Sequence, residues 1–416
     1  MLTIRIYFVK NYYNIVSMVK QVEKYRVRES YKLGVLSKAG QKSRCSKIQE
    51  MVGVWLAISI FVFLQVKGEP DRVLLKDDQE MSGQIVKKNI RGIELKKEKE
   101  TVKIEYNKIK RYFYGDNKSE WELIFDSLLT GNFSKAIIQL GELESISKRP
   151  MMKEDIKFYL ALAYYNQKNY DSFFDSLESL IKDFPDSYYL YHIISFIVDL
   201  SESSEIGEIP VKLTRLANNI VMGGTKQKVQ KDKLIEGVSR LIEGFVKERG
   251  GNIIEANEIY KEVTEKYNDN EVIFCAGQIF AIRGLIKDNK LDEAEKKLKE
   301  LQENLIKTEN YFFLKNSWSM LGDVYKKQAD LNNEKRGKFL EQALYAYLNV
   351  YLFYIPGPEE LPEIYAKSLY YGSLILSELS QTAKTEAQKT EWRNKSQSMR
   401  SELKQKYPNT IWAGKL

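Results

Sequence analysis

Histidine, cysteine, proline and glycine are all scarce in this chain of 416 residues, which has one histidine, two cysteines, eight prolines and 23 glycines. A single histidine excludes metal and catalytic sites that need two, and two cysteines exclude a disulfide framework. So few prolines and glycines exclude a collagen and a disordered low-complexity chain. We therefore expect His192 to be a packed helix residue and Cys275 to be an inert core thiol. We expect no metal and no cofactor.

The chain also lacks a uniform charge. Its formal net charge is +8, but residues 1–50 alone hold 11 basic and three acidic residues. The rest of the chain contains as many basic as acidic residues, so it has no overall attraction for a polyanion. The sequence thus predicts a basic extension over 1–50 and no nucleic-acid partner.

One long stretch carries no charge, the 16 residues from Met51 to Val66. As a helix it would span about 24 Å, which is short of the roughly 30 Å hydrocarbon core of a bilayer. Lys42, Arg44 and Lys47 precede it, and this charge bias keeps the preceding residues in the cytoplasm. We interpret 51–68 as a signal peptide or membrane anchor, with residues 67–416 in the cell envelope, either periplasmic or anchored to the inner membrane.

Three alternatives remain open for this segment. It is cleaved near Gly68, it stays as an anchor in the membrane, or it is a buried helix of a soluble protein. The long leader also leaves open whether translation starts at Met1, Met18 or Met51.

Residues 71–115 alternate between apolar and polar side chains, which predicts about five short strands. Strands this short must curl into a small barrel or pack on the next domain. The pattern from Asp71 to Gly115 resembles the Sm-like or SH3-like barrels that precede helical repeats in some exported bacterial proteins. The module has 12 basic and eight acidic residues. This excess forms either an anion-binding face or water-facing strand surfaces that discourage edge pairing.

From residue 117 onward, apolar residues recur every three or four positions, which predicts helices joined by short turns. The stretch Trp318-x-x-Leu321-Gly322-x-x-Tyr325 resembles the first helix of a tetratricopeptide repeat. Four further fragments resemble the same repeat: Leu160 to Tyr164, Gly131 to Ala136, Gly251 to Ala256, and Asn289 to Ala294. Repeats are then expected to start near 117, 154, 237, 275 and 315, with an irregular pair over 188–236 and a final pair over about 361–408.

The best-matched repeat makes two specific predictions. Gly322 should let the second helix, over 338–355, pass close to its backbone, so Gly322→Leu should be destabilising and Gly322→Ala nearly neutral. A long polar loop should run from Ala329 to Lys338. The apolar stretch from Leu340 to Ile355 is either core or an exposed docking strip.

The resemblance implies a mainly α fold, with a tetratricopeptide-like α-solenoid over 117–416 that follows the small β barrel and the N-terminal hydrophobic segment. Such a solenoid holds a peptide or protein partner in a concave groove. In this family the ligand-facing positions are the second, fifth, ninth and twelfth of each repeat. On the two better-matched repeats these are Asp155, Phe158, Leu162 and Tyr165, and Asn316, Ser319, Asp323 and Lys326.

The sequence therefore predicts a non-enzymatic interaction scaffold of a bacterial envelope. One alternative is a structural envelope protein whose basic β module binds cell wall or anionic lipid. Another is a cell-wall-acting enzyme, which would need two converging carboxylates in a deep cleft. Gly223-Gly224-Thr225-Lys226 lacks the order and the preceding strand of a phosphate-binding loop, and we expect it to be a turn between helices.

Overall fold

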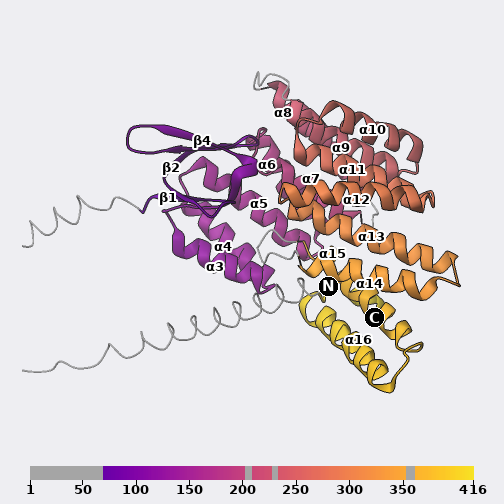
Figure 1. Ribbon diagram of the computed structural model, residues 1–416. Helices are drawn as coiled ribbons and strands as arrows, with labels where there is room; N and C mark the ends of the chain where they lie inside the picture. Colours follow the sequence, from indigo (N-terminus) through magenta and orange to yellow (C-terminus); the bar gives the residue numbers. More distant parts are fainter. Residues whose placement is uncertain (1–68, 202–208, 227–232, 353–360) are drawn as a thin grey trace, which may run out of the picture. The chain divides into compact units, whose positions relative to one another are not determined.

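A computed structural model describes residues 69–201, 209–226, 233–352 and 361–416. The segment from Met51 to Val66 and the polar run over 202–208 lie outside the described residues. Gly68–Leu416 forms one compact unit, in which a small antiparallel sheet precedes a mainly helical part (Figure 1). Within the described residues, no helix combines the length and the apolar character that a membrane span requires.

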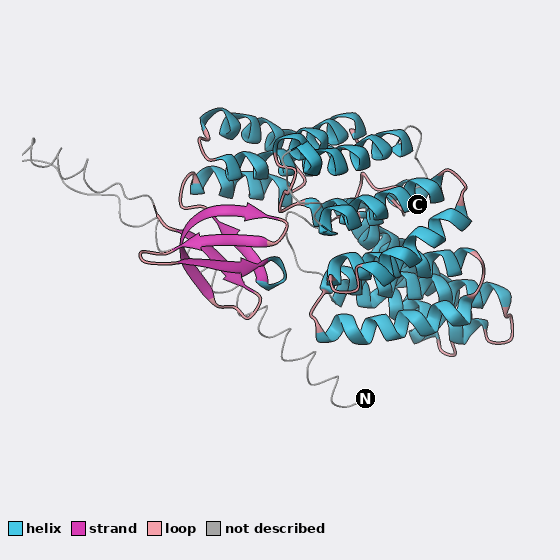
Figure 2. Cartoon of the chain, turned by 90° about the horizontal axis from the view of Figure 1, so that it is seen from above, coloured by secondary structure: helices cyan, strands magenta, loops and turns pink. Residues whose placement is uncertain are grey.

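The predicted strands are present, and all of their pairings are antiparallel. They are β1 (Asp71–Leu75), β2 (Glu80–Asn89), β3 (Gly92–Lys96), β4 (Thr101–Glu105) and, after the short 3-10 helix η2 (Tyr106–Lys108), β5 (Ile109–Phe113). The order across the sheet is β4-β3-β2-β1-β5, so the last strand returns to pair with the first. Figure 2 shows a strongly curved sheet. Its two edges are β4 and β5.

A register irregularity in β2 changes which side chains face the core. The pairing of β2 with β3 shifts between Ile85 and Lys87. As a result Ile85 is buried, Val86 and Lys87 are both exposed, and Lys88 is buried again. Such a bulge inserts one residue and reverses the alternation beyond it. The inward-facing strand residues belong to the same hydrophobic core as the first helices.

Most of the helical part consists of consecutive helix pairs. The six pairs among the described residues are α3 (Lys118–Leu129) with α4 (Phe133–Ile146), α5 (Pro150–Asn166) with α6 (Tyr170–Asp183), α9 (Lys233–Arg249) with α10 (Ile253–Lys266), α11 (Glu271–Lys287) with α12 (Leu291–Lys307), α13 (Tyr311–Leu331) with α14 (Arg336–Leu352), and α15 (Glu363–Leu379) with α16 (Glu386–Lys406). The irregular pair expected over 188–236 does not form: α7 (Leu190–Leu200) packs on α9 and α11, whereas α8 (Ile209–Lys226) packs on α6 and α9. Five first helices begin at Lys118, Pro150, Lys233, Glu271 and Tyr311, close to the predicted starts near 117, 154, 237, 275 and 315.

The turns inside four of these pairs share one backbone feature. Each contains a single residue with positive φ: Gly131, Lys168, Gly251 and Asn289. A left-handed residue ends the first helix and lets the chain reverse within three or four residues. In α4, α10 and α12 the fourth residue is a fully buried alanine, which leaves room for the neighbouring helix.

Two local predictions were wrong. The loop expected from Ala329 to Lys338 is mostly helical, because α13 continues to Leu331 and α14 begins at Arg336. Residues 223–226 form the last turn of α8 and not a turn between helices. Asp330 and Lys338 are exposed at their helix ends, and a sequence pattern alone does not distinguish polar residues at a helix end from a loop.

Close packing at Gly322 is confirmed. A Cβ atom built there would lie 2.6 Å from Tyr347 Cε1, and Tyr347 belongs to α14 and is fully buried. The stretch that begins at Leu340 is mainly core, although Tyr345 is 62% exposed and Leu348 is 41% exposed. Its last residues, 353–355, lie outside the described residues.

Candidate functional site

A cavity of about 640 Å³ lies between the sheet and the helical part. One wall is β5 together with η2. The opposite wall consists of the N-terminal turns of α3, α7, α11 and α13, with Asp155 and Tyr159 from α5. The volume is in the range of pockets that hold a small molecule or a short segment of peptide.

Aromatic side chains dominate this cavity. Thirteen of its lining residues are phenylalanine, tyrosine or tryptophan. They pack against one another at tilted or edge-on angles, as Tyr106 does against Tyr188 and Tyr191 with ring centroids 4.8 Å apart in both cases. Such surfaces offer a ligand large apolar contact areas at a low entropic cost.

Two of these aromatic residues carry polar atoms without a partner. The Tyr114 hydroxyl and the Trp121 indole nitrogen are buried and have no hydrogen-bond partner among the described residues. A buried polar group left unpaired costs about 1–3 kcal/mol. Both atoms lie inside the wall, with almost no surface open to a ligand.

Six basic and four acidic residues line the cavity, and three of the basic residues pair with a carboxylate. Lys110 lies 2.5 Å from Asp78, Lys118 lies 3.5 Å from Glu69, and Arg72 lies 3.7 Å from Glu80. Lys76 and Arg111 also line the cavity and are exposed. Neither of them has a carboxylate within 4.0 Å among the described residues, so both are available to an acidic ligand.

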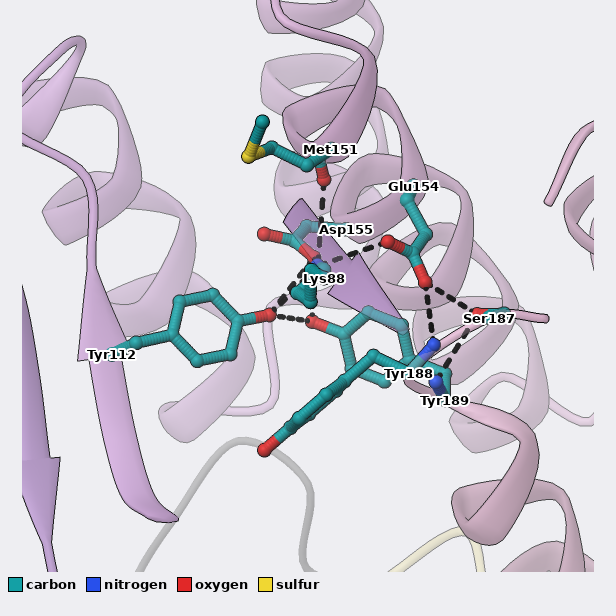
Figure 3. Close-up of polar contacts among 8 residues, drawn as sticks. All are labelled: Lys88, Tyr112, Met151, Glu154, Asp155, Ser187, Tyr188 and Tyr189. Atoms are coloured by element: carbon teal, nitrogen blue, oxygen red, sulfur yellow. Dashed lines mark hydrogen bonds and ion pairs between the residues drawn. The ribbon is translucent and has the colours of Figure 1, made fainter. Parts of the chain in front are cut away.

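Lys88 of β2 is buried behind the tyrosine wall of the cavity (Figure 3). Its ammonium group pairs with Asp155 and lies 3.3 Å from Glu154 Oε2. It also donates to the Tyr112 hydroxyl at 3.0 Å and to the Met151 carbonyl at 3.4 Å. Three tyrosine rings surround it within 5.6 Å. The charge of Lys88 is therefore neutralised inside the protein.

The two carboxylates beside Lys88 are also fully engaged. Asp155 Oδ1 accepts hydrogen bonds from the hydroxyls of Tyr112 and Tyr189, each at 2.9 Å. Glu154 Oε1 accepts from the Ser187 hydroxyl at 2.6 Å and from the backbone N–H of residue 188 at 2.8 Å. Two carboxylates do converge here, but both are bound within a buried hydrogen-bond and ion-pair network.

Burial determines how these groups titrate. Loss of hydration, opposed by the charge of Glu154, lowers the pKa of Lys88 to about 8. Burial also raises the pKa of Tyr112 and of Tyr189 well above the usual value for a phenol. Both tyrosines are therefore neutral hydrogen-bond donors across the physiological pH range.

A second contact attaches the sheet to the helices. Arg149, just before α5, binds both carboxylate oxygens of Asp71 in β1, at 2.9 and 2.6 Å. Asp71 also accepts from the backbone N–H groups of Ile85 at 2.7 Å and Gly115 at 2.9 Å. Such two-point pairing fixes orientation as well as position, so β1 and its neighbour β5 are held in a defined place along the cavity.

The scarce reactive residues occupy interior positions. His192 is half-buried in the cavity wall, with Nδ1 3.5 Å from the Tyr106 hydroxyl, and loss of hydration together with the nearby Lys88 lowers its pKa to about 4. Cys275 is buried, and burial raises the pKa of its thiol to about 12. No cluster of side chains suited to a metal ion occurs within the described ranges.

The groove residues expected on the first of the two repeats lie inside the protein. Asp155, Phe158, Leu162 and Tyr165 are at most 5% exposed. Phe158 stacks on Tyr189 with ring centroids 3.9 Å apart, because the segment that leads into α7 covers this face of α5. Only Asp155 among these four lines the cavity.

The groove residues expected on the second repeat are also buried or already paired with other side chains. Asn316 and Ser319 are buried. Asp323 accepts from the Tyr347 hydroxyl at 2.7 Å and pairs with Lys367 at 2.6 Å, while Lys326 pairs with Asp330 at 3.2 Å. None of these four lines the large cavity.

Sequence reasoning missed the residues that form the cavity, apart from the predicted groove residue Asp155. Tyr112, Phe113 and Tyr114 attract notice as an aromatic cluster, but the pairing of Lys88 with Asp155 has no local signal. Comparisons with protein-family models, with curated proteins and with solved structures found no match.

Proposed function

We propose that the chain is a non-enzymatic scaffold that binds a peptide or protein partner in the aromatic cavity beside β5. In this proposal the helix pairs form a tetratricopeptide-like solenoid and the curved sheet is a small barrel in front of it. The protein would act in the cell envelope, either secreted across or anchored to the inner membrane by the segment from Met51 to Val66.

The aromatic lining of the cavity is the observation that carries this proposal. Thirteen aromatic residues around about 640 Å³ suit apolar side chains of a partner, and aromatic residues are enriched in the cores of protein interfaces.

The acid–base groups near the cavity support binding more than catalysis. A general acid or base needs a pKa near the working pH and contact with the substrate. His192 has a pKa of about 4, and Asp155 is occupied by Lys88 and two tyrosines. His192 and Asp155 are therefore suited to a structural role in the wall of the cavity.

Selection from a phage-displayed library of random 12-residue peptides against the full chain tests the proposal. We expect selected peptides to lose at least tenfold in affinity for Phe312→Ala, which shortens a half-buried cavity residue. The matched control is Tyr345→Ala, an exposed aromatic residue on α14, which should bind like the wild type.

Failure to select any peptide, or equal loss with both variants, would reject the cavity as the binding site. If the full chain bound vesicles of anionic phospholipid and no peptide, the alternative of a basic envelope-binding module would be favoured instead.

A further inference from the structure

The open edge of β5 faces the cavity. Every residue from Ile109 to Tyr114 lines it, although successive side chains of a strand point to opposite faces of the sheet. A cavity that contacts all six residues must therefore lie alongside the strand edge. In the sheet order β5 is terminal, so no strand among the described residues covers this edge.

The hydrogen-bonding pattern identifies the backbone groups on that edge. Lys76 N–H donates to the Lys108 carbonyl at 3.0 Å, and Gly115 N–H donates to the Asp71 carboxylate at 2.9 Å. The carbonyl of Lys108 and the N–H of Gly115 therefore point toward β1. The pairs Leu74–Arg111 and Arg72–Phe113 are in register.

Leu75 N–H donates to Gln79 on the β2 side. Because backbone groups alternate sides along an antiparallel strand, residues 72 and 74 point toward β5. Arg111 and Phe113 therefore pair with β1, and the N–H and C=O groups of Tyr112 face the cavity. They have no hydrogen-bond partner among the described residues.

The charge of β5 limits what can cover this edge. Lys108, Lys110 and Arg111 are exposed within four consecutive residues. Two copies of β5 side by side would place these cations close together, and like charges on paired strands are destabilising. An acidic strand would instead meet Arg111 and Lys76, two exposed cations that line the cavity and have no carboxylate within 4.0 Å among the described residues.

We propose that the partner enters as an extended acidic peptide that adds a sixth strand to the open edge of β5. Its backbone pairs with Tyr112, its acidic side chains meet Arg111 and Lys76, and its aromatic or aliphatic side chains enter the cavity. A strand of five residues spans about 17 Å, so a segment of this length matches β5. This mode of recognition is strand addition, and it rests on the proposed function.

The probe is the acetylated and amidated peptide Glu-Phe-Glu-Val-Glu-Phe-Glu, titrated into the full chain by calorimetry. Two analogues carry backbone N-methyl groups on alternate residues, one on positions 2, 4 and 6 and the other on positions 3 and 5. Each analogue blocks one edge of the peptide strand and leaves the side chains unchanged. We expect one analogue to lose at least tenfold in affinity and the other to stay within threefold of the parent.

Substitutions in the protein test the charge requirement. Arg111→Ala should weaken binding of the probe two- to fivefold, the size expected for an exposed ion pair. Lys87→Ala, which removes an exposed cation from β2 outside the cavity, should leave the affinity unchanged.

Equal binding or equal loss with both N-methylated analogues would overturn strand addition. The inference also fails if the probe does not bind, or if the chain is a dimer that the probe dissociates. In these cases the proposed function still stands if binding of the peptides selected from the random library depends on Phe312. It fails as well if their binding does not depend on Phe312.

Discussion

Lys88 in the sheet and Asp155 in α5 form an ion pair whose side chains are 0% and 3% exposed. The two residues are 67 positions apart in the sequence. Their pairing, together with that of Arg149 and Asp71, attaches the sheet to the first helices. Without this attachment β5 would have no fixed position opposite α7, α11 and α13. The proposed binding cavity therefore depends on an ion pair between Asp155, which lines it, and Lys88, which lies behind its wall.

Removing the positive charge of Lys88 should destabilise the protein strongly. Lys88→Met leaves Asp155 and Glu154 buried without a counter-charge, and breaking a buried pair in this way typically costs about 3–5 kcal/mol. Urea unfolding should show this loss as a lower midpoint. Lys103→Ala is the matched control, because Lys103 is 81% exposed and lies 4.0 Å from Glu94; its free energy of unfolding should change by less than about 0.5 kcal/mol.

Equal midpoints for the two variants would mean that Lys88 contributes nothing to the attachment. Hydrogen exchange adds a second readout, since amide protection in β1 and β5 should fall in Lys88→Met more than protection in α15 and α16.

The role of Lys88 illustrates what sequence reasoning could not supply. The period-two pattern predicted the five strands correctly and suggested that lysines on this module face water. Regular alternation from the buried Ile85 would indeed expose Lys88, but the bulge between Ile85 and Lys87 reverses its direction. A one-residue insertion in the pairing leaves no trace in the sequence, and neither does the position of Asp155 across the interface.

The single histidine gives a direct test of burial at the cavity. Loss of hydration and the charge of Lys88 lower the pKa of His192 to about 4 from 6.5, while Tyr106, Phe158, Tyr188 and Tyr189 surround its ring. One imidazole resonance should therefore titrate near pH 4 in an NMR experiment. A midpoint near 6.5 would show that the ring is hydrated.

The same shift sets the direction of a pH effect on stability. Between pH 4 and 6.5 the unfolded chain binds a proton at His192 that the folded chain does not, so the free energy of unfolding falls as the pH is lowered through this range. The expected loss attributable to this residue is about 1–3 kcal/mol. His192→Gln, which does not titrate, should lose less stability than the wild type over the same interval.

Gly322 provides a prediction in which the structure corrects the sequence. We expected Gly322→Ala to be nearly neutral, but its methyl group would lie within 2.8 Å of three ring carbons of Tyr347. That ring is buried, and its hydroxyl is bonded to Asp323, so it cannot move away freely. Overpacking of this kind costs about 1–3 kcal/mol, partly offset by the better helix propensity of alanine.

Gly141 is the matched control for this change. It lies within α4, is exposed, and has no atom within 4 Å of the position of a Cβ. Gly141→Ala should raise the urea midpoint, because alanine is favoured over glycine by about 1 kcal/mol inside a helix, whereas Gly322→Ala should lower it. A raised midpoint in both variants would contradict the packing of α14 on α13.

The helix pairs were predictable because their signals are local. Each pair is marked by apolar residues at helical spacing, by a left-handed residue in the turn and by a small residue in the second helix. All three signals lie within a stretch of about 35 residues. The groove positions depend instead on which faces the neighbouring elements leave open. Phe158 is covered by Tyr189, which no repeat signature records.

Photo-cross-linking tests the central claim, that a peptide binds in the cavity beside β5, most directly. Phe113 lines the cavity and is half-buried, and it can be replaced by the photoreactive residue p-benzoylphenylalanine in the full chain. The same replacement at Tyr345 serves as the comparison, since this exposed residue of α14 belongs to the apolar stretch that could act as a docking strip. With a peptide selected from the random library, the account predicts a covalent adduct, located by mass spectrometry, at position 113 and none at 345. An adduct at 345 with none at 113 would contradict it.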